Sequence, residues 1–126
     1  MSLGRDQVWK RRLVGLLPNL VRPNCVDLAC GTGDVSAELA RRYPQGNIVG
    51  IDLTPAMLDV ARERCPEPNV NFRSQDMCQT GLPAGWADVV TGSYALRNAP
   101  VLDDALREVR RLLKPGGYAA FLDFAK

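Results

Sequence analysis

The sequence predicts an α/β protein built on one parallel sheet, and two observations carry this prediction. Apolar runs of strand length alternate with helical segments from Asn24 onward, as in chains assembled from βαβ units. One apolar run, Cys25 to Ala29, leads directly into the glycine turn Gly31-Thr32-Gly33 and then into a helical segment. We therefore expect strands that run in one direction and end at a shared edge of the sheet.

The chain has 126 residues, the size of a single domain that can bury a core. We expect one domain over residues 1–126, with an N-terminal helix over 6–17 and a sheet-containing core over 24–126. The strands are predicted at 25–29, 47–52, 70–74, 87–93 and 118–124. The helices between them are predicted at 34–42, at 55–64 and from 102 to the turn at 115–117.

Turn and cap signals set these boundaries. Pro18 ends the N-terminal helix, and the run Tyr43-Pro44-Gln45-Gly46 ends the next one. Thr54 is a cap residue, and Pro55 occupies the first helical position, where proline is favourable. Residues 81–85 are turn material and precede the fourth strand.

The last helix has the clearest periodicity in the chain. Its expected buried face carries apolar residues at helical spacing: Leu102, Leu106, Val109, Leu112 and Leu113. Its expected solvent face carries charged residues: Arg107, Glu108, Arg110 and Arg111. The turn Pro115-Gly116-Gly117 then separates this helix from the fifth strand.

Right-handed crossovers and a switch point beside the first strand predict the strand order 3-2-1-4-5, with helices on both faces. The second strand ends on Asp52, which follows Gly33 by about the 20 residues expected of a nucleoside-cofactor site. The glycines let the backbone approach a ligand, and the acid is suited to binding ribose hydroxyls. In the alternative, the glycines only permit positive φ in an ordinary turn. The presence of both Asp27 and Asp52 favours the cofactor site.

The acids beside the glycine turn distinguish two kinds of nucleoside cofactor. A dinucleotide fingerprint has a third glycine where this chain has Ser36. Asp27 and Asp34 flank the turn, and two carboxylates there disfavour a pyrophosphate anion. The same carboxylates suit S-adenosylmethionine (SAM), which carries a sulfonium and an ammonium group. We therefore predict SAM as the cofactor, with a dinucleotide oxidoreductase as a distant alternative.

Composition argues against several other classes. The net charge of +2 gives no electrostatic basis for nucleic-acid binding, and no apolar run reaches the ~20 residues of a transmembrane segment. The chain contains no histidine, which excludes histidine-dependent triads and proton shuttles within it. Its four cysteines lack metal-ligand spacing, so we expect no metal site and reduced thiols in a cytoplasmic protein.

Taken together, the motifs resemble class I SAM-dependent methyltransferases, a Rossmann-like family. More narrowly, they resemble the UbiE/MenG group, which C-methylates ubiquinone and menaquinone precursors. The similarity covers nearly the whole chain. It rests on Val8-Trp9-Lys10-Arg11, Asp27 to Asp34, Ala95-Leu96-Arg97-Asn98, Leu112 to Gly117 and Leu122 to Lys126.

The resemblance implies a cofactor site at the carboxyl ends of the strands. The residues expected around the methionine and ribose are Asp27, Gly31, Thr32, Gly33 and Asp52. Those expected around the adenine are Leu53, Met57, Asp76 and Met77, and Ser93 is expected to close the pocket beside the sulfonium. Some have a structural alternative: Met57 as a core residue, Asp76 as an ordinary loop acid and Ser93 as a cap.

Methylation of a phenolic ring carbon requires the ring to lose a proton. The resemblance points to Arg97 and Asn98 as catalytic residues, with Arg97 stabilising a phenolate or positioning a water molecule. Tyr94 is a further candidate for either role. In the alternative, Arg97 only pairs with a structural acid such as Asp103.

Members of the group begin earlier, with a segment that covers the cofactor, and continue with a helix and an antiparallel strand pair. This sequence ends at Lys126, so we expect an apparently truncated form without those C-terminal antiparallel strands. We expect it to bind SAM weakly and not to methylate a quinone precursor alone. The apolar run Tyr118 to Leu122 leaves an open sheet edge, which favours pairing with a second copy.

Two other functions stay open at this point. A methyltransferase with a different small-molecule acceptor has the same cofactor motifs, and a panel of acceptors separates it from the quinone enzymes. A non-catalytic SAM-binding domain would show affinity for SAM without activity. In each case the expected partner is a small molecule, with the homodimer through the fifth strand as the only protein partner.

Overall fold

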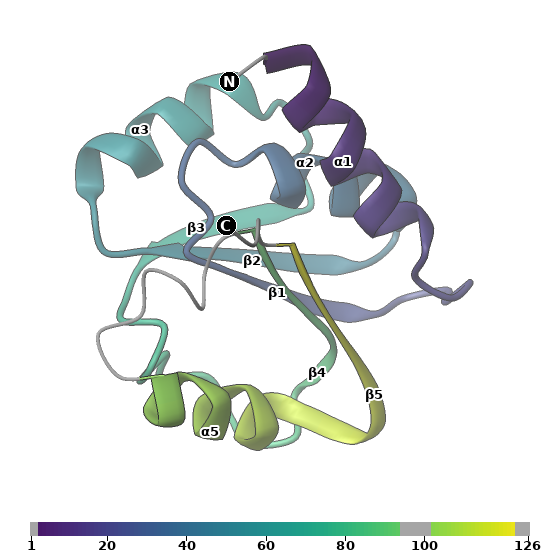
Figure 1. Ribbon diagram of the computed structural model, residues 1–126, viewed down its shortest axis with the longest axis vertical. Helices are drawn as coiled ribbons and strands as arrows, with labels where there is room; N and C mark the ends of the chain where they lie inside the picture. Colours follow the sequence, from purple (N-terminus) through teal and green to yellow (C-terminus); the bar gives the residue numbers. More distant parts are fainter. Residues whose placement is uncertain (1–2, 94–101, 123–126) are drawn as a thin grey trace.

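The computed structural model describes residues 3–93 and 102–122, which form a parallel sheet flanked by helices (Figure 1). The helices are α1 (Leu3–Gly15), α2 (Asp34–Arg42), α3 (Pro55–Arg64) and α5 (Leu102–Leu112). The strands are β1 (Asn24–Leu28), β2 (Asn47–Asp52), β3 (Val70–Ser74), β4 (Ala87–Ser93) and β5 (Leu113–Leu122).

The strands lie in the order β3-β2-β1-β4-β5, and every neighbouring pair is parallel. The central strand β1 sets Cys25 beside Ile48 of β2 on one side and beside Val89 of β4 on the other. The predicted strand order and fold class are confirmed. Because all the strands run in one direction, the turns that follow β1, β2, β3 and β4 gather at one edge of the sheet.

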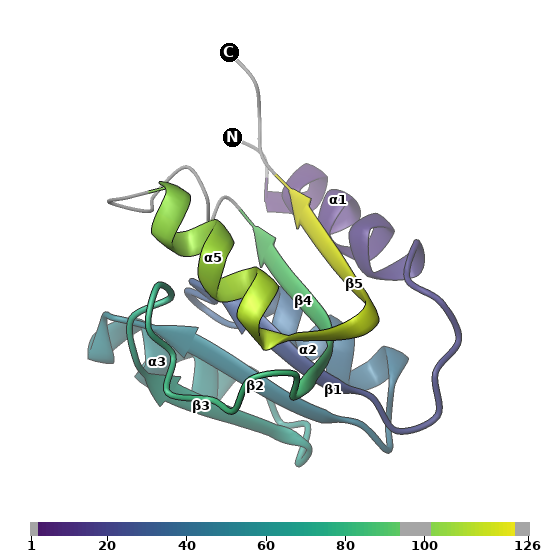
Figure 2. The ribbon, with the colours of Figure 1, turned by 90° about the horizontal axis from the view of Figure 1, so that it is seen from below.

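Helices cover both faces of the sheet, as predicted. Figure 1 shows α1, α2 and α3 on one face and α5 on the other. Figure 2 looks toward the face that α5 covers; in this view α5 lies next to β4, and β5 lies on the other side of β4. The two faces are thus covered unequally, with one helix on the α5 side among the described residues.

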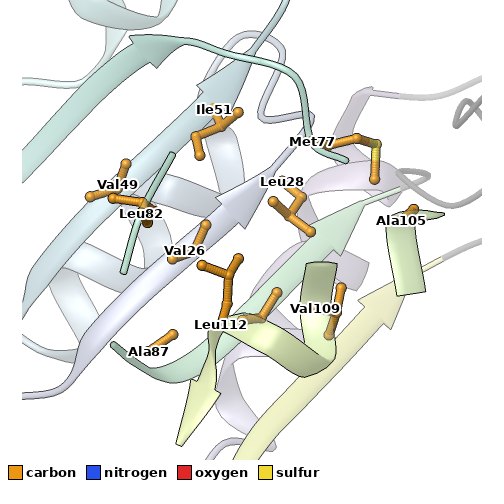
Figure 3. Close-up of a cluster of buried hydrophobic side chains, with 11 residues drawn as sticks. Val26, Leu28, Val49, Ile51, Met77, Leu82, Ala87, Ala105, Val109 and Leu112 are labelled. Atoms are coloured by element: carbon orange, nitrogen blue, oxygen red, sulfur yellow. The ribbon is translucent and has the colours of Figure 1, made fainter. Parts of the chain in front are cut away.

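Alternating strand positions divide the buried side chains into two layers. In β1, Val26 and Leu28 point toward α5, whereas Cys25 points toward α2. The layer under α5 is shown in Figure 3 and includes Val49, Ile51, Met77, Leu82, Ala87, Ala105, Val109 and Leu112. The layer under α1 and α2 includes Leu13, Val14, Leu17, Val35, Leu39, Tyr43, Ile48 and Val89.

The buried face of α5 differs from the predicted one. Leu102 and Leu106 are 49% and 43% exposed, although the apolar periodicity placed them in the core. The buried residues are Ala105, Glu108, Val109 and Leu112. Val109 and Leu112 are buried as predicted. The prediction was wrong for Leu102, Leu106 and Glu108, because apolar residues occupy two overlapping stripes of this helix and the stripe that packs on the sheet contains the glutamate.

The ends of three other elements also differ from the prediction. Helix α1 ends at Gly15 rather than Leu17, because the Leu17 N–H donates to Val14 in a tighter turn. Strand β1 ends at Leu28, since Ala29 adopts a positive φ. Strand β5 begins at Leu113 because this residue already pairs with Ala87 before the register shifts.

Candidate functional site

Two adjoining pockets lie at the carboxyl edge of the sheet, on either side of the turn after β1. The Asp52 pocket has a volume of about 370 Å³ and is lined by Ala29, Gly31, Ile51, Asp52, Leu53, Thr54, Met57, Gln75, Asp76 and Met77. The Asp27 pocket has a volume of about 220 Å³ and is lined by Lys10, Asp27, Ala29, Cys30, Gly31, Thr32, Asp34, Val35, Met57 and Ser93. Since both linings include Ala29, Gly31 and Met57, the pockets are parts of one groove.

The glycine turn is shaped by alternating residues with positive φ. Ala29, Gly31 and Gly33 have φ values of 50°, 56° and 84°. The turn is tied to the next strand by the Cys30 N–H, which donates to the carbonyl of Ile51 at 2.8 Å. Left-handed backbone is unfavourable for a residue with a Cβ, so Ala29 is a strained position that borders both pockets.

Gly33 lies on the outer side of this turn. It lines a cavity of about 450 Å³ between α1, α2 and α3, which shares Thr32 and Asp34 with the Asp27 pocket. Gly33 itself lines neither the Asp27 pocket nor the Asp52 pocket. A Cβ at Gly33 would lie 3.0 Å from both Ala61 and Phe72. Positive φ and close packing against α3 and β3 therefore account for this glycine.

Asp52 is held in place by backbone groups from two loops. Its Oδ2 accepts a hydrogen bond from the Gly31 N–H at 2.8 Å, and its Oδ1 accepts one from the Thr54 N–H at 2.9 Å. Each carboxylate oxygen has a second lone pair. Asp52 can therefore accept two more hydrogen bonds from vicinal hydroxyl groups in the pocket.

The rest of the Asp52 pocket is mainly apolar. Leu53 and Met57 have 62% and 42% of their surface exposed, whereas Met77 is buried, with 7% exposed. Asp76 lies beside them, and its Oδ1 accepts a hydrogen bond from the Cys78 N–H at 2.8 Å. Apolar side chains beside a carboxylate can accommodate a planar heterocycle that donates a hydrogen bond.

Asp27 is the most deeply buried acid of the site, with 1% of its surface exposed. Ser36 Oγ donates to its Oδ2 at 2.7 Å, and Thr91 Oγ1 donates to its Oδ1 at 3.0 Å. Burial raises the pKa of Asp27 to about 6, against the opposing hydrogen bonds from Ser36 and Thr91 and the charge of Lys10. The carboxylate is thus largely ionised at pH 7 and remains so partly because of its two hydroxyl partners.

Ser93 contributes a buried hydroxyl to the Asp27 pocket. Its Oγ has no hydrogen-bond partner among the described residues. On the opposite wall, Lys10 Nζ pairs with Asp34 Oδ2 at 3.1 Å. A buried hydroxyl without a partner is uncommon, and a polar ligand group in this pocket would supply one.

Cys30 also lines the Asp27 pocket. Burial, followed by the charges of Asp27 and Asp52, raises the pKa of its thiol well above the ordinary value. The thiol is therefore protonated at neutral pH and is a poor nucleophile.

The structure brings nine of the ten predicted cofactor-binding residues to the groove; Gly33 lies outside it. The three predicted catalytic residues, Tyr94, Arg97 and Asn98, lie outside the described residues.

Sequence reasoning missed Lys10 and Ala29, which line the groove, and Thr91, which lies behind its lining and donates to Asp27. Ala29 was assigned to a strand, and neither Lys10 nor Thr91 was predicted as a site residue. A usable signal existed for Thr91, because a hydroxyl in an apolar central strand faces inward and needs a buried partner. Lys10 and Ala29 carried no such signal, since only the tertiary packing of α1 and the path of the turn place them here.

No described helix is long and apolar enough to cross a membrane. Within the same part of the chain, no group of three or more cysteines and acids is arranged to hold a metal ion.

Comparison with known proteins identifies methyltransferases as relatives of this chain. A family profile described as a methyltransferase domain matches residues 25–117. A 2-phytyl-1,4-naphtoquinone methyltransferase of Thermosynechococcus vestitus is 39% identical over 127 residues, covering 99% of this chain and 56% of that protein. The demethylmenaquinone methyltransferase of Thermus thermophilus is 36% identical, with 98% of this chain and 57% of that protein covered.

A solved structure gives the same answer. The S-adenosylmethionine dependent methyltransferase of Mesorhizobium loti superimposes with a TM-score of 0.81 at 28% identity, covering 95% of this chain and 54% of that one. The chain spans just over half the length of the curated relatives it matches.

The strand order, the glycine turn and the groove at the carboxyl edge define a Rossmann-like α/β domain. The chain belongs to the methyltransferase domain family, whose profile matches residues 25–117. The predicted family is therefore confirmed, and the curated relatives include the quinone-precursor methyltransferases that the motifs resemble.

Proposed function

We propose that this chain is the cofactor-binding region of a SAM-dependent methyltransferase that C-methylates a quinone precursor or a similar phenolic small molecule. Family membership and the names of the curated relatives support the proposal. The observation that carries it is Asp52, a carboxylate held by the Gly31 and Thr54 N–H groups at the edge where Rossmann-like sheets bind nucleosides.

In this proposal the adenosine half of SAM occupies the Asp52 pocket. The two free lone pairs of Asp52 accept the ribose hydroxyls. Leu53, Met57 and Met77 flank the adenine ring, and Asp76 accepts a hydrogen bond from its amino group. The mainly apolar lining of this pocket fits that assignment.

The methionine half of SAM occupies the Asp27 pocket. Asp27 faces the ammonium group, and the backbone of Gly31 and Thr32 lies close to the methionine chain. Gly33 supports the turn on its side facing α3 and β3. Ser93, whose hydroxyl has no described partner, closes the pocket beside the sulfonium. Asp34 is paired with Lys10 and Arg64, so the carboxylate of Asp27 is the charge of this small pocket that supports a cationic ligand over a pyrophosphate.

When bound, SAM supplies a methyl group already activated by its sulfonium. The residues of this chain contribute by aligning the acceptor with that group and by excluding water from the groove. Tyr94, Arg97 and Asn98 are our candidates for stabilising a phenolate or removing the ring proton, on the strength of the sequence resemblance alone.

Calorimetric titration tests the cofactor assignment. We expect the wild type to bind S-adenosylhomocysteine and SAM but not NADH. Substitution of Asp52→Ala removes two charge-assisted hydrogen bonds to ribose and should weaken binding at least about tenfold. Asp59→Ala, on the exposed side of α3, is the matched control and should leave affinity unchanged.

Binding of NADH without the adenosyl ligands would contradict the proposal, as would equal affinity in the Asp52→Ala and wild-type proteins. Methyl transfer to a short-chain naphthoquinol, measured with a labelled methyl group, then tests the acceptor. Transfer to another acceptor in a panel would replace the quinone precursor, and tight binding without transfer to any of them would indicate a non-catalytic SAM-binding domain.

We also propose a partner and a location. Strand β5 pairs with β4 on one side, which supports pairing of its other edge with a second copy of the chain. The four cysteines are free thiols, which supports a cytoplasmic location: Cys25, Cys30, Cys65 and Cys78.

A further inference from the structure

Two hydroxyl groups from different elements converge on the buried carboxylate of Asp27. Ser36 comes from the first turn of α2, and Thr91 comes from the middle of β4. They donate to different oxygens, Ser36 to Oδ2 at 2.7 Å and Thr91 to Oδ1 at 3.0 Å. With one hydroxyl on each oxygen, the carboxyl group cannot rotate without losing a hydrogen bond.

Both donors are enclosed as completely as the acceptor. Ser36 and Thr91 have no exposed surface, and Asp27 has 1%. A serine in a helix often donates to a backbone carbonyl of the preceding turn, but here the hydroxyl of Ser36 donates to Asp27 instead. Space for this hydroxyl depends on β2, because a Cβ at Gly50 would lie 2.9 Å from Ser36 Oγ.

The charged and titratable groups around Asp27 come from four segments. Helix α1 contributes Lys10, the glycine turn contributes Cys30, and the start of α2 contributes Asp34. Strand β1 contributes the thiol of Cys25, whose pKa is raised by burial and by the charges of Asp88 and Asp27. Lys10 favours the carboxylate, but its ammonium group is also paired with Asp34 at 3.1 Å. Strand β4 presents the uncharged Thr91 and Ser93, so the carboxylate is stabilised directly by the two hydroxyls and by the backbone N–H of Ser36.

We propose that Ser36 and Thr91 are positioning residues that hold Asp27 ionised, and fixed in orientation, at the wall of the Asp27 pocket. This inference rests on the proposed function, because Asp27 is the group assigned to the ammonium end of the cofactor. It extends that function by assigning two residues that lie outside the lining of the pocket and act through Asp27.

The proposal has a consequence that a purely structural role lacks. Burial alone favours the protonated form of Asp27, and donated hydrogen bonds favour the carboxylate. If one hydroxyl is removed, the pKa of Asp27 rises from about 6 toward or above neutrality. At pH 7 the carboxyl group is then neutral in about half of the variant molecules, and it regains the charge at higher pH.

The test is the affinity for S-adenosylhomocysteine between pH 5.5 and 8.5, measured calorimetrically for the wild type, Ser36→Ala and Thr91→Val. In the wild type we expect affinity to weaken below about pH 6. In both variants we expect that midpoint to move up by about one pH unit, with a loss of affinity of about fivefold at pH 6 and about twofold at pH 7 that is largely recovered at pH 8.5.

Two controls separate this effect from general damage. Thr91→Ser keeps a hydroxyl and should keep the wild-type midpoint. Ser74→Ala removes an exposed hydroxyl at the end of β3 and should behave as the wild type. A carbon-detected NMR titration of the Asp27 carboxyl group without ligand gives the midpoint directly in each folded variant, independently of affinity.

An unchanged Asp27 midpoint in both Ser36→Ala and Thr91→Val would overturn the proposal. A loss of affinity that is equal at every pH would also overturn it, because that result indicates a steric effect. If the wild type does not bind S-adenosylhomocysteine at any pH, the proposed function fails, and the NMR midpoints still decide whether the two hydroxyls set the ionisation of Asp27.

Discussion

Asp27 is a carboxylate in the interior whose ionisation opposes folding. Burial raises the pKa of Asp27 in the folded chain to about 6, from an ordinary value of 3.8. The folded state therefore binds the proton more tightly than the unfolded state. This tighter proton binding by Asp27 stabilises the folded state fully below about pH 4, and the stabilisation is lost as pH rises through 6.

Substitution of Asp27→Asn should remove this pH dependence. The difference of two pKa units corresponds to roughly 3 kcal/mol, so we expect the variant to gain about that much relative stability between pH 4 and pH 7. Urea unfolding at pH 4, 5, 6 and 7 measures the free energy of unfolding for both proteins. A constant difference between them across this range would contradict the prediction.

The sequence predicted Asp27 and Asp52 as site residues because each lies at or near the end of an apolar strand. It could not predict the partners of Asp27. Ser36 is nine residues away and Thr91 sixty-four residues away along the chain, and only the pairing of β1 with β4 and the packing of α2 bring them together. The sequence showed Ser36 merely as the residue replacing a third glycine.

At the scale of an element, α5 is attached to the loop between β3 and β4 by a buried glutamate. Glu108 is 6% exposed, and its Oε2 accepts hydrogen bonds from both the N–H and the Oγ1 of Thr80, at 3.0 and 2.6 Å. Arg111 binds both of its oxygens at 2.7 Å. Burial raises the pKa of Glu108, but the hydrogen bonds from Arg111 and Thr80 outweigh it, and the pKa lies below its ordinary value.

Substitution of Glu108→Ala should destabilise the fold by about 3 kcal/mol, because the buried N–H and hydroxyl of Thr80 lose their acceptor. The matched control lies in the same helix, where Asp104 pairs with Arg107 at the same spacing but in solvent. Asp104→Ala should cost less than about 1 kcal/mol. Chemical denaturation measures the free energy of unfolding of both variants. Similar losses in the two variants would show that the buried contact stabilises the fold no more than the exposed ion pair does.

Helix α5 also shows where periodicity stops being informative. The spacing of its apolar residues predicted a helix correctly, with bounds close to the observed Leu102–Leu112. The choice of buried face depended on whether Glu108 could be satisfied inside. That is decided by Thr80, in a loop that the pattern of α5 does not describe.

At the scale of the whole molecule, the order and direction of the strands were predictable. Right-handed connections leave few topologies for alternating strands and helices, and the observed order is one of them. Element ends were less predictable, as at β5, where Leu113 pairs with Ala87 and Tyr118 with Val89, so that the residues between form an irregular segment. The proline and glycines at 115–117 predicted a turn here, but they did not predict that strand β5 would begin before the turn, at Leu113.

The proposed homodimer makes a prediction at this scale. If β5 pairs with a second copy, sedimentation velocity should show a concentration-dependent dimer. Tyr118 is 47% exposed on this strand, and Tyr118→Lys should shift the equilibrium toward monomer because charge on an edge strand opposes pairing. A wild-type protein that stays monomeric at high concentration would contradict the proposal.

The two backbone hydrogen bonds of Asp52 have a kinetic consequence. This carboxylate is immobilised by the Gly31 and Thr54 N–H groups, so an arriving nucleoside meets an acceptor that needs no rotamer search. Little side-chain entropy is lost there on association. We therefore expect ligand capture at this position to be limited by diffusional encounter, with differences between adenosyl ligands expressed mainly in how long each remains bound.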